Sequence, residues 1–123
     1  MIVVGVGVEP GTPAENLAAA LAGLGLDPEE IDVVATVDDR AAEPAVTAVA
    51  QRRVLRTYPY AALAAVEVPN PSEVVRRLTG SGSVAEAAAL LAARELGNGC
   101  ATLVVEKRRG AGVTVAAARP GAV

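Results

Sequence analysis

The apolar residues of this sequence are almost all aliphatic, and many of them are small. The 123 residues include no Phe and no Trp, and Tyr58 and Tyr60 are the only aromatic side chains, although 52% of the residues are apolar. This apolar content predicts a folded chain, and the length predicts one domain with its own core. Because that core has to consist of Val, Leu and Ala, its helices can lie close to a sheet.

Short runs of β-branched residues alternate along the chain with alanine-rich segments. The β-branched runs predict strands, which cover residues 2–8, 31–37, 54–56, 101–106 and 113–118. The alanine-rich segments predict helices, which cover residues 13–25, 44–52, 58–65, 71–78 and 84–97. This order predicts the α/β class, with a mixed, mainly parallel sheet that is flanked by helices on both faces and ends in an antiparallel hairpin. We expect a single domain over residues 1–119 and a frayed tail over residues 120–123.

Three tetrapeptides have the pattern of a helix N-terminus, in which a capping side chain is followed three residues later by a glutamate. They begin at Thr12, Asn70 and Ser83. The last one predicts that Ser83 and Glu86 cap each other at the start of the longest helix. The pair Asp27-Pro28 predicts a short capped turn before the second strand.

Residues that the chain lacks exclude several kinds of chemistry. It has no His, and Cys100 is its only Cys, so we expect no Ser-His or Cys-His nucleophile pair, no metal site and no cofactor. A net charge of −3 and the shortage of aromatic side chains argue against binding to nucleic acid. No apolar run reaches membrane-spanning length, and the N-terminus lacks a signal-peptide pattern. We therefore expect a cytoplasmic protein that does not contact a membrane.

Two segments rich in glycine and hydroxyl groups could hold an anion. Gly7, Gly11 and Thr12 follow the first strand, where backbone amides can approach a ligand. Their spacing differs from the dinucleotide-binding pattern, so a tight strand-to-helix turn is the alternative that we favour. The second segment comprises Ser81, Gly82 and Ser83, at the start of a long helix whose dipole attracts an anion. For Ser83, a role in capping alone is an equal alternative.

Charged side chains follow two further strands. Asp38 and Glu43 could act as acid and base or bind a hard cation, although such residues more often belong to a solvated, helix-capping loop. Lys107 is the only lysine and could pair with an anionic ligand. It begins the segment 107–112, which predicts a tight basic turn between the last two strands. A solvated hairpin tip is therefore the alternative for Lys107.

Two central motifs resemble those of a known family. The segments 66–75 (VEVPNPSEVV) and 82–91 (GSVAEAAALL) are similar to the signature of the CobE / CbiG C-terminal family of cobalamin (corrin ring) biosynthesis. The glycines of the first loop, the segment 35–38 and the pair Glu43-Pro44 occur in the order typical of that family, so the resemblance covers nearly the whole chain. Where the family often has a Lys after the second strand, this chain has Arg40, which keeps the charge.

The resemblance implies a protein that binds a precorrin or cobalt-precorrin intermediate as an accessory factor. These macrocycles are fringed with carboxylates, so a receptor needs backbone amides and cations beside an apolar wall. The Gly7–Thr12 loop, Arg40, the Ser81–Ser83 segment and Lys107 would provide them if they lie at the same end of the sheet.

The resemblance also leaves two alternatives open. Longer proteins of the CbiG type are associated with opening the lactone ring of cobalt-precorrin-5A. A hydrolase would use Asp38 or Glu43 as a general base, with the Ser81–Ser83 amides stabilising the oxyanion. The other alternative is a protein–protein interaction module that binds other enzymes of the cobalamin pathway.

Overall fold

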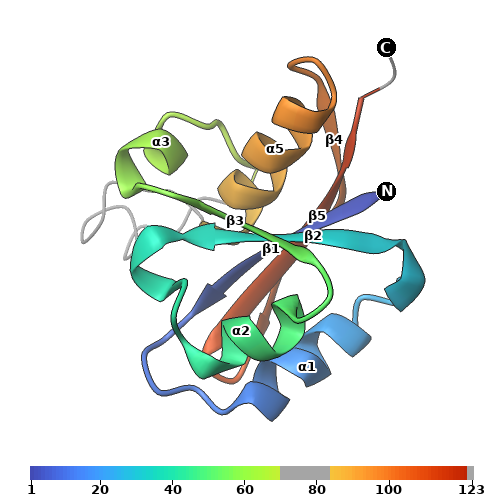
Figure 1. The fold of residues 1–123 in the computed structure, drawn as a ribbon. Helices are drawn as coiled ribbons and strands as arrows, with labels where there is room; N and C mark the ends of the chain where they lie inside the picture. The colour runs from blue at the N-terminus through green and yellow to red at the C-terminus, as the bar shows by residue number, and fades with distance from the viewer. Residues whose placement is uncertain (70–83, 122–123) are drawn as a thin grey trace.

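The computed structural model of the chain describes residues 1–69 and 84–121. These residues form a five-stranded sheet with helices on both faces (Figure 1), which confirms the predicted α/β class. The strands are β1 (Ile2–Val8), β2 (Ile31–Val37), β3 (Val54–Tyr58), β4 (Ala101–Gly110) and β5 (Val113–Pro120). The helices are α1 (Ala14–Ala22), α2 (Pro44–Ala50), α3 (Tyr60–Ala64) and α5 (Val84–Leu96). None of these helices is both long enough and apolar enough to cross a lipid bilayer.

The strand order in the sheet is β3-β2-β1-β5-β4. β2 lies parallel to both β1 and β3, whereas β5 runs antiparallel to both β1 and β4. The sheet therefore has as many antiparallel as parallel pairs, and "mainly parallel" overstated the parallel share. The physical reason is that the C-terminal hairpin joins β1 through β5, its antiparallel strand, so both of its pairs are antiparallel. As a result, the carboxyl ends of β1, β2, β3 and β4 all lie at one end of the sheet, which we call the carboxyl end.

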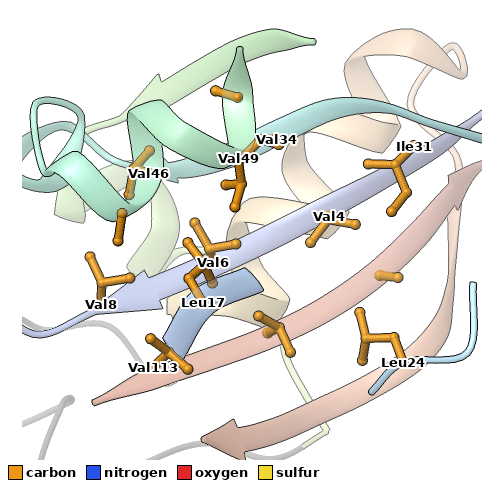
Figure 2. Close-up of a cluster of buried hydrophobic side chains, with 14 of the residues drawn as sticks. Val4, Val6, Val8, Leu17, Leu24, Ile31, Val34, Val46, Val49 and Val113 are labelled. Atoms are coloured by element: carbon orange, nitrogen blue, oxygen red, sulfur yellow. The ribbon is translucent and has the colours of Figure 1, made fainter. Parts of the chain in front are cut away.

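Each face of the sheet carries its own apolar core. Side chains alternate between the two faces along a strand, so Val4, Val6 and Val8 of β1 point to the same side. On that side, α1 and α2 cover the sheet with Leu17, Val46 and Val49, as Figure 2 shows. The opposite side is covered by α3 and α5 (Figure 1), and its core is rich in alanine. The aliphatic residues of the sequence are thus divided between two thin core layers, one on each face of the sheet.

Helix α5 lies against the backbone of β1. It buries six alanines, and a Cβ added to Gly5 would come within 1.9 Å of the Ala85 carbonyl oxygen and 2.7 Å of the Ala89 nitrogen. Only a residue without a side chain fits at Gly5. The small residues of the sequence therefore permit a helix-to-sheet distance that larger side chains would prevent.

The two ends of helix α1 differ from the prediction. Helix α1 begins after Pro13 and has no side-chain cap, so the predicted capping role of Thr12 is wrong. The Thr12 hydroxyl donates instead to the Glu9 carbonyl oxygen at 2.7 Å. Helix α1 also ends at Ala22, before the predicted end at residue 25, and the prediction that it contains Leu24 is wrong.

The structure confirms the predicted cap at Asp27 and shows a longer last strand than the sequence predicted. The carboxylate of Asp27 accepts a hydrogen bond from the Glu29 amide at 3.0 Å and caps a short 3-10 turn, as predicted. Pro120, assigned above to a frayed tail, is the last residue of β5, and the Gly121 amide donates to the Cys100 carbonyl at 2.8 Å. The helix expected at 71–78, with its cap at Asn70, lies outside the described residues.

The close approach of α5 gives a first prediction. Gly5→Ala should lower the free energy of unfolding by about 3 kcal/mol or more, because a contact with helix backbone cannot be relieved by rotating a side chain. Gly23→Ala is the matched control, since Gly23 has a φ of −69° and the nearest atoms lie 3.4 Å from an added Cβ. The control should change stability by less than about 1 kcal/mol. Urea unfolding measures both variants, and equal stabilities would contradict the close packing.

Candidate functional site

The loop between β1 and α1 is fastened to the turn between β4 and β5. The Glu9 amide donates to the Gly112 carbonyl at 2.9 Å, and the Thr12 hydroxyl lies 3.3 Å from the same oxygen. The side-chain amide of Asn16 donates to the Ala111 carbonyl at 3.1 Å. These contacts exist because β5 is the neighbour of β1, so the hairpin turn comes beside the loop at the carboxyl end.

The segment after β2 is attached to the same loop. Arg40 Nε donates to the Val8 carbonyl at 2.9 Å, and Glu43 Oε1 accepts a hydrogen bond from the Gly11 amide at 2.9 Å. Gly11 has a φ of +80°, which suits glycine and lets its amide face the carboxylate. Asp38 is exposed at the end of β2. Arg40 and Glu43 therefore fix the shape of the loop from β1 to α1.

The first turn of α5 lies close to β1 near the carboxyl end of the sheet. Helix α5 starts above Gly7, where an added Cβ would lie 3.7 Å from the Cβ of Val84 and 2.6 Å from the hydroxyl oxygen of Thr114. The absence of a side chain at Gly7 thus lets the Thr114 hydroxyl lie close to β1. Ser81, Gly82 and Ser83, which were predicted to contact a ligand at this helix start, lie outside the described residues.

Glu86 is a buried acid on α5, and it fixes the course of β4. None of its surface is exposed, and its Oε2 accepts a hydrogen bond from the Lys107 amide at 2.8 Å. Val105 pairs with Ala117 and Arg108 with Val115, so β4 has a bulge between these positions. The bulge interrupts the regular ladder at Lys107, and Glu86 accepts a hydrogen bond from the amide of this residue.

Lys107 lies within strand β4, so the predicted turn over residues 107–112 is too long. The turn contains only Ala111 and Gly112, and Lys107 is half-buried rather than at a solvated tip. Burial lowers the pKa of the Lys107 ammonium below its usual value, and the charge of Arg109 lowers that pKa further. The negative charge of Glu86 acts in the opposite direction.

Six of the described candidate residues lie at the carboxyl end of the sheet: Gly7, Gly11, Thr12, Asp38, Arg40 and Glu43. Lys107 lies further back on β4, opposite Ala116, where its amide contacts Glu86 of α5. Sequence reasoning missed Thr114, which pairs with Gly7, and Arg109, which pairs with Thr114 from the other side. The sequence held no local signal for either residue, because their alignment with Gly7 depends on the order of the strands. Among the described residues, no group of three Asp, Glu or Cys side chains could hold a metal ion.

A second polar cluster joins β3 to α5. Tyr58 donates its hydroxyl hydrogen to Glu95 Oε1, and Arg56 forms an ion pair with the same oxygen at 3.0 Å. Burial, together with the hydrogen bond to Glu95, raises the pKa of Tyr58 to about 12. The cluster fastens the last turns of α5 to the sheet.

Comparison with known proteins identifies the class to which this small α/β domain belongs. Residues 2–118 match the family model described as Cobalamin synthesis G C-terminus. The chain therefore belongs to this family, which confirms the resemblance seen in its central motifs. A curated relative, Protein CobE of Sinorhizobium sp, is 41% identical over an alignment of 128 positions that covers 97% of this chain and 80% of the relative.

Two solved structures share the fold. The crystal structure of CobE, described as a protein from the cobalamin (vitamin B12) biosynthetic pathway, has a TM-score of 0.87 and 35% identity, covering 96% of this chain and 92% of that one. The crystal structure of cobalamin biosynthesis protein chiG from Agrobacterium tumefaciens str. C58 has a TM-score of 0.70 and 27% identity. That match covers 98% of this chain and 99% of the other. The relatives are thus named as proteins of cobalamin biosynthesis.

The Glu86 contact can be tested by two substitutions. Glu86→Ala should lower the free energy of unfolding by about 2–4 kcal/mol, because it leaves the Lys107 amide without its acceptor and opens a cavity. Glu86→Gln keeps a carbonyl oxygen of similar size, so its loss should be about 1 kcal/mol. Urea unfolding distinguishes the two, and wild-type stability of Glu86→Ala would refute the buried contact.

The Tyr58 cluster predicts a pH dependence. In a Tyr60→Phe background, the ultraviolet absorbance of tyrosinate should report ionisation of Tyr58 at about pH 12. Glu95→Gln should lower that pKa, because it removes the negative charge that disfavours tyrosinate. Glu30→Gln is the control: Glu30 pairs with Arg119 at 3.0 Å and should leave the pKa unchanged. The raised pKa contributes stability that is complete below the unfolded pKa of about 10 and is lost as the pH rises through about 12.

Proposed function

We propose that this protein binds a precorrin or cobalt-precorrin intermediate of cobalamin biosynthesis and acts as an accessory factor. The observation that carries the proposal is the joining of the β1–α1 loop to Arg40 at the carboxyl end of the sheet, with Lys107 further back on β4, in a member of this family. Open α/β sheets bind ligands at this end. Backbone amides and cations suit the carboxylates that surround such a macrocycle.

The surroundings of Glu43 favour binding over hydrolysis. A general base needs a carboxylate that can reach water and substrate, whereas the Glu43 carboxylate accepts the Gly11 amide hydrogen. Asp38 lies exposed at the end of β2 and is a candidate base for the hydrolase alternative. We therefore assign Glu43 to the shape of the loop and treat lactone hydrolysis as the alternative that the experiments below test.

The proposed binding takes place in the cytoplasm, and other enzymes of the pathway are the proposed recipients of the intermediate. The exposed, unpaired thiol of Cys100 suits a reducing compartment.

The proposal predicts saturable binding that depends on Lys107. Titration with a series of corrin-pathway intermediates should change the absorbance of the macrocycle, with a stoichiometry of one for the cognate intermediate. Lys107→Gln should weaken this binding about tenfold, the usual effect of losing a charge-assisted hydrogen bond. Arg119→Gln is the matched control, because it removes one positive charge where Arg119 pairs with Glu30, which immediately precedes β2. That variant should bind within about twofold of the wild type.

Two results would change the proposed function. The absence of binding across the whole series would favour a protein partner as the ligand. Turnover of a lactone-bearing intermediate by the isolated chain, abolished in Glu43→Gln, would establish the hydrolase alternative. Glu43→Gln retains an oxygen that can accept the Gly11 amide hydrogen, so it separates the loss of a base from the loss of the loop.

A further inference from the structure

Three neighbouring strands align a glycine, a hydroxyl group and a cation at the start of α5. Thr114 of β5 pairs with Gly7 of β1 on one side and with Arg109 of β4 on the other. The residues that flank Thr114, Val113 and Val115, belong to the core beneath α1 and α2. Because side chains alternate along a strand, the row of Gly7, Thr114 and Arg109 faces the side that α5 covers.

The row is accessible where α5 begins. Thr114 is half-buried and Arg109 is exposed, while Gly7 has no side chain to cover the hydroxyl group. Within residues 1–69 and 84–121, neither the Thr114 hydroxyl nor the Arg109 guanidinium makes a hydrogen bond or an ion pair. A half-buried hydroxyl beside a guanidinium is a pairing that matches a carboxylate, which accepts hydrogen bonds from both.

The bulge in β4 brings a second cation next to the row. Val105 and Arg108 face α1, so the two bulged residues between them, Glu106 and Lys107, oppose Ala116 on the α5 side. Arg109 is close enough to Lys107 to lower the pKa of its ammonium, so the two positive charges are neighbours. The negative charges of Glu86 and Glu106, which lie on the same side, partly offset the positive charges of Lys107 and Arg109. We therefore expect weak binding of a single carboxylate, with a dissociation constant on the order of millimolar.

We propose that Arg109 and Thr114, with Lys107 beside them, form a subsite that binds one peripheral carboxylate of the ligand. The identity of that ligand rests on the proposed function, but the preference for a carboxylate can be measured without it. Arg108 supplies an internal comparison. It is the next residue on β4 and carries the same charge, yet it faces α1, where its guanidinium donates to the Gly23 carbonyl at 3.1 Å.

The subsite can be tested first with a small acid. Titration of the ¹⁵N-labelled chain with succinate should shift the amide resonances of residues 107–109 and 114, and succinamide should not. Arg109→Gln should remove these shifts, whereas Arg108→Gln should retain them. Shifts that are absent, or that are lost equally in both variants, would overturn the subsite regardless of whether any corrin binds.

A second experiment connects the subsite to the macrocycle. For an intermediate that the wild type binds, Arg109→Gln and Thr114→Val should each raise the dissociation constant, by about tenfold and about threefold respectively. Arg108→Gln should stay within about twofold. Wild-type affinity in both Arg109→Gln and Thr114→Val would refute the subsite and leave the proposed function standing. Failure of the wild type to bind any intermediate, with the succinate shifts present, would refute only the proposed function.

Discussion

The contact between α5 and the glycine-bearing part of β1 determines how the groups beneath α5 are arranged. A helix can lie this close only where the strand has no side chain and the helix presents alanine, and Gly5 with Ala85 and Ala89 meet both conditions. The first turn of α5 is then held above Gly7, and Glu86 is carried into the interior. Its buried carboxylate needs a donor, which a bulged strand supplies through the Lys107 amide. The close packing of α5 on β1 thus creates the need for a hydrogen-bond donor to the buried Glu86 carboxylate.

The position of β5 has an equally broad effect. Because this strand lies between β1 and β4, the last turn of the chain contacts the first loop, and residues about one hundred positions apart share hydrogen bonds. Arg40 and Glu43 attach the segment after β2 to the same loop. The carboxyl end is therefore a cross-linked set of loops whose shape does not depend on any single segment. Such a prearranged surface loses little conformational entropy when a ligand binds.

The fold was largely predictable because its signals are local. β-branched runs and alanine-rich segments gave the strands and most of the helices, and the rule that parallel strands end together placed the candidate loops at one edge. The errors concern residues whose partners are distant in the sequence. Thr12 has the sequence pattern of a capping residue, yet its hydroxyl group contacts the carbonyl oxygens of Glu9 and Gly112 instead.

The features that matter most at the site were also the hardest to infer. Periodicity cannot reveal that β4 contains bulges, so the sequence pattern placed Lys107 in a turn instead of a strand. Nothing local shows that a distant amide will donate to Glu86, and the cap predicted for it with Ser83 lies outside the described residues. Thr114 and Arg109 become neighbours of Gly7 only through the order of strands, which the sequence left open.

The irregular shape of β4 has a further consequence, for the behaviour of the protein at high concentration. β4 is an edge strand of ten residues, and the described sheet ends with its outer row of backbone groups. A long, straight edge would be a template on which another copy could add its own strand. The two irregularities in the β4 register interrupt that row, and Glu106, Arg108 and Arg109 place charge along it. The bulge that positions Lys107 therefore also opposes edge-to-edge aggregation.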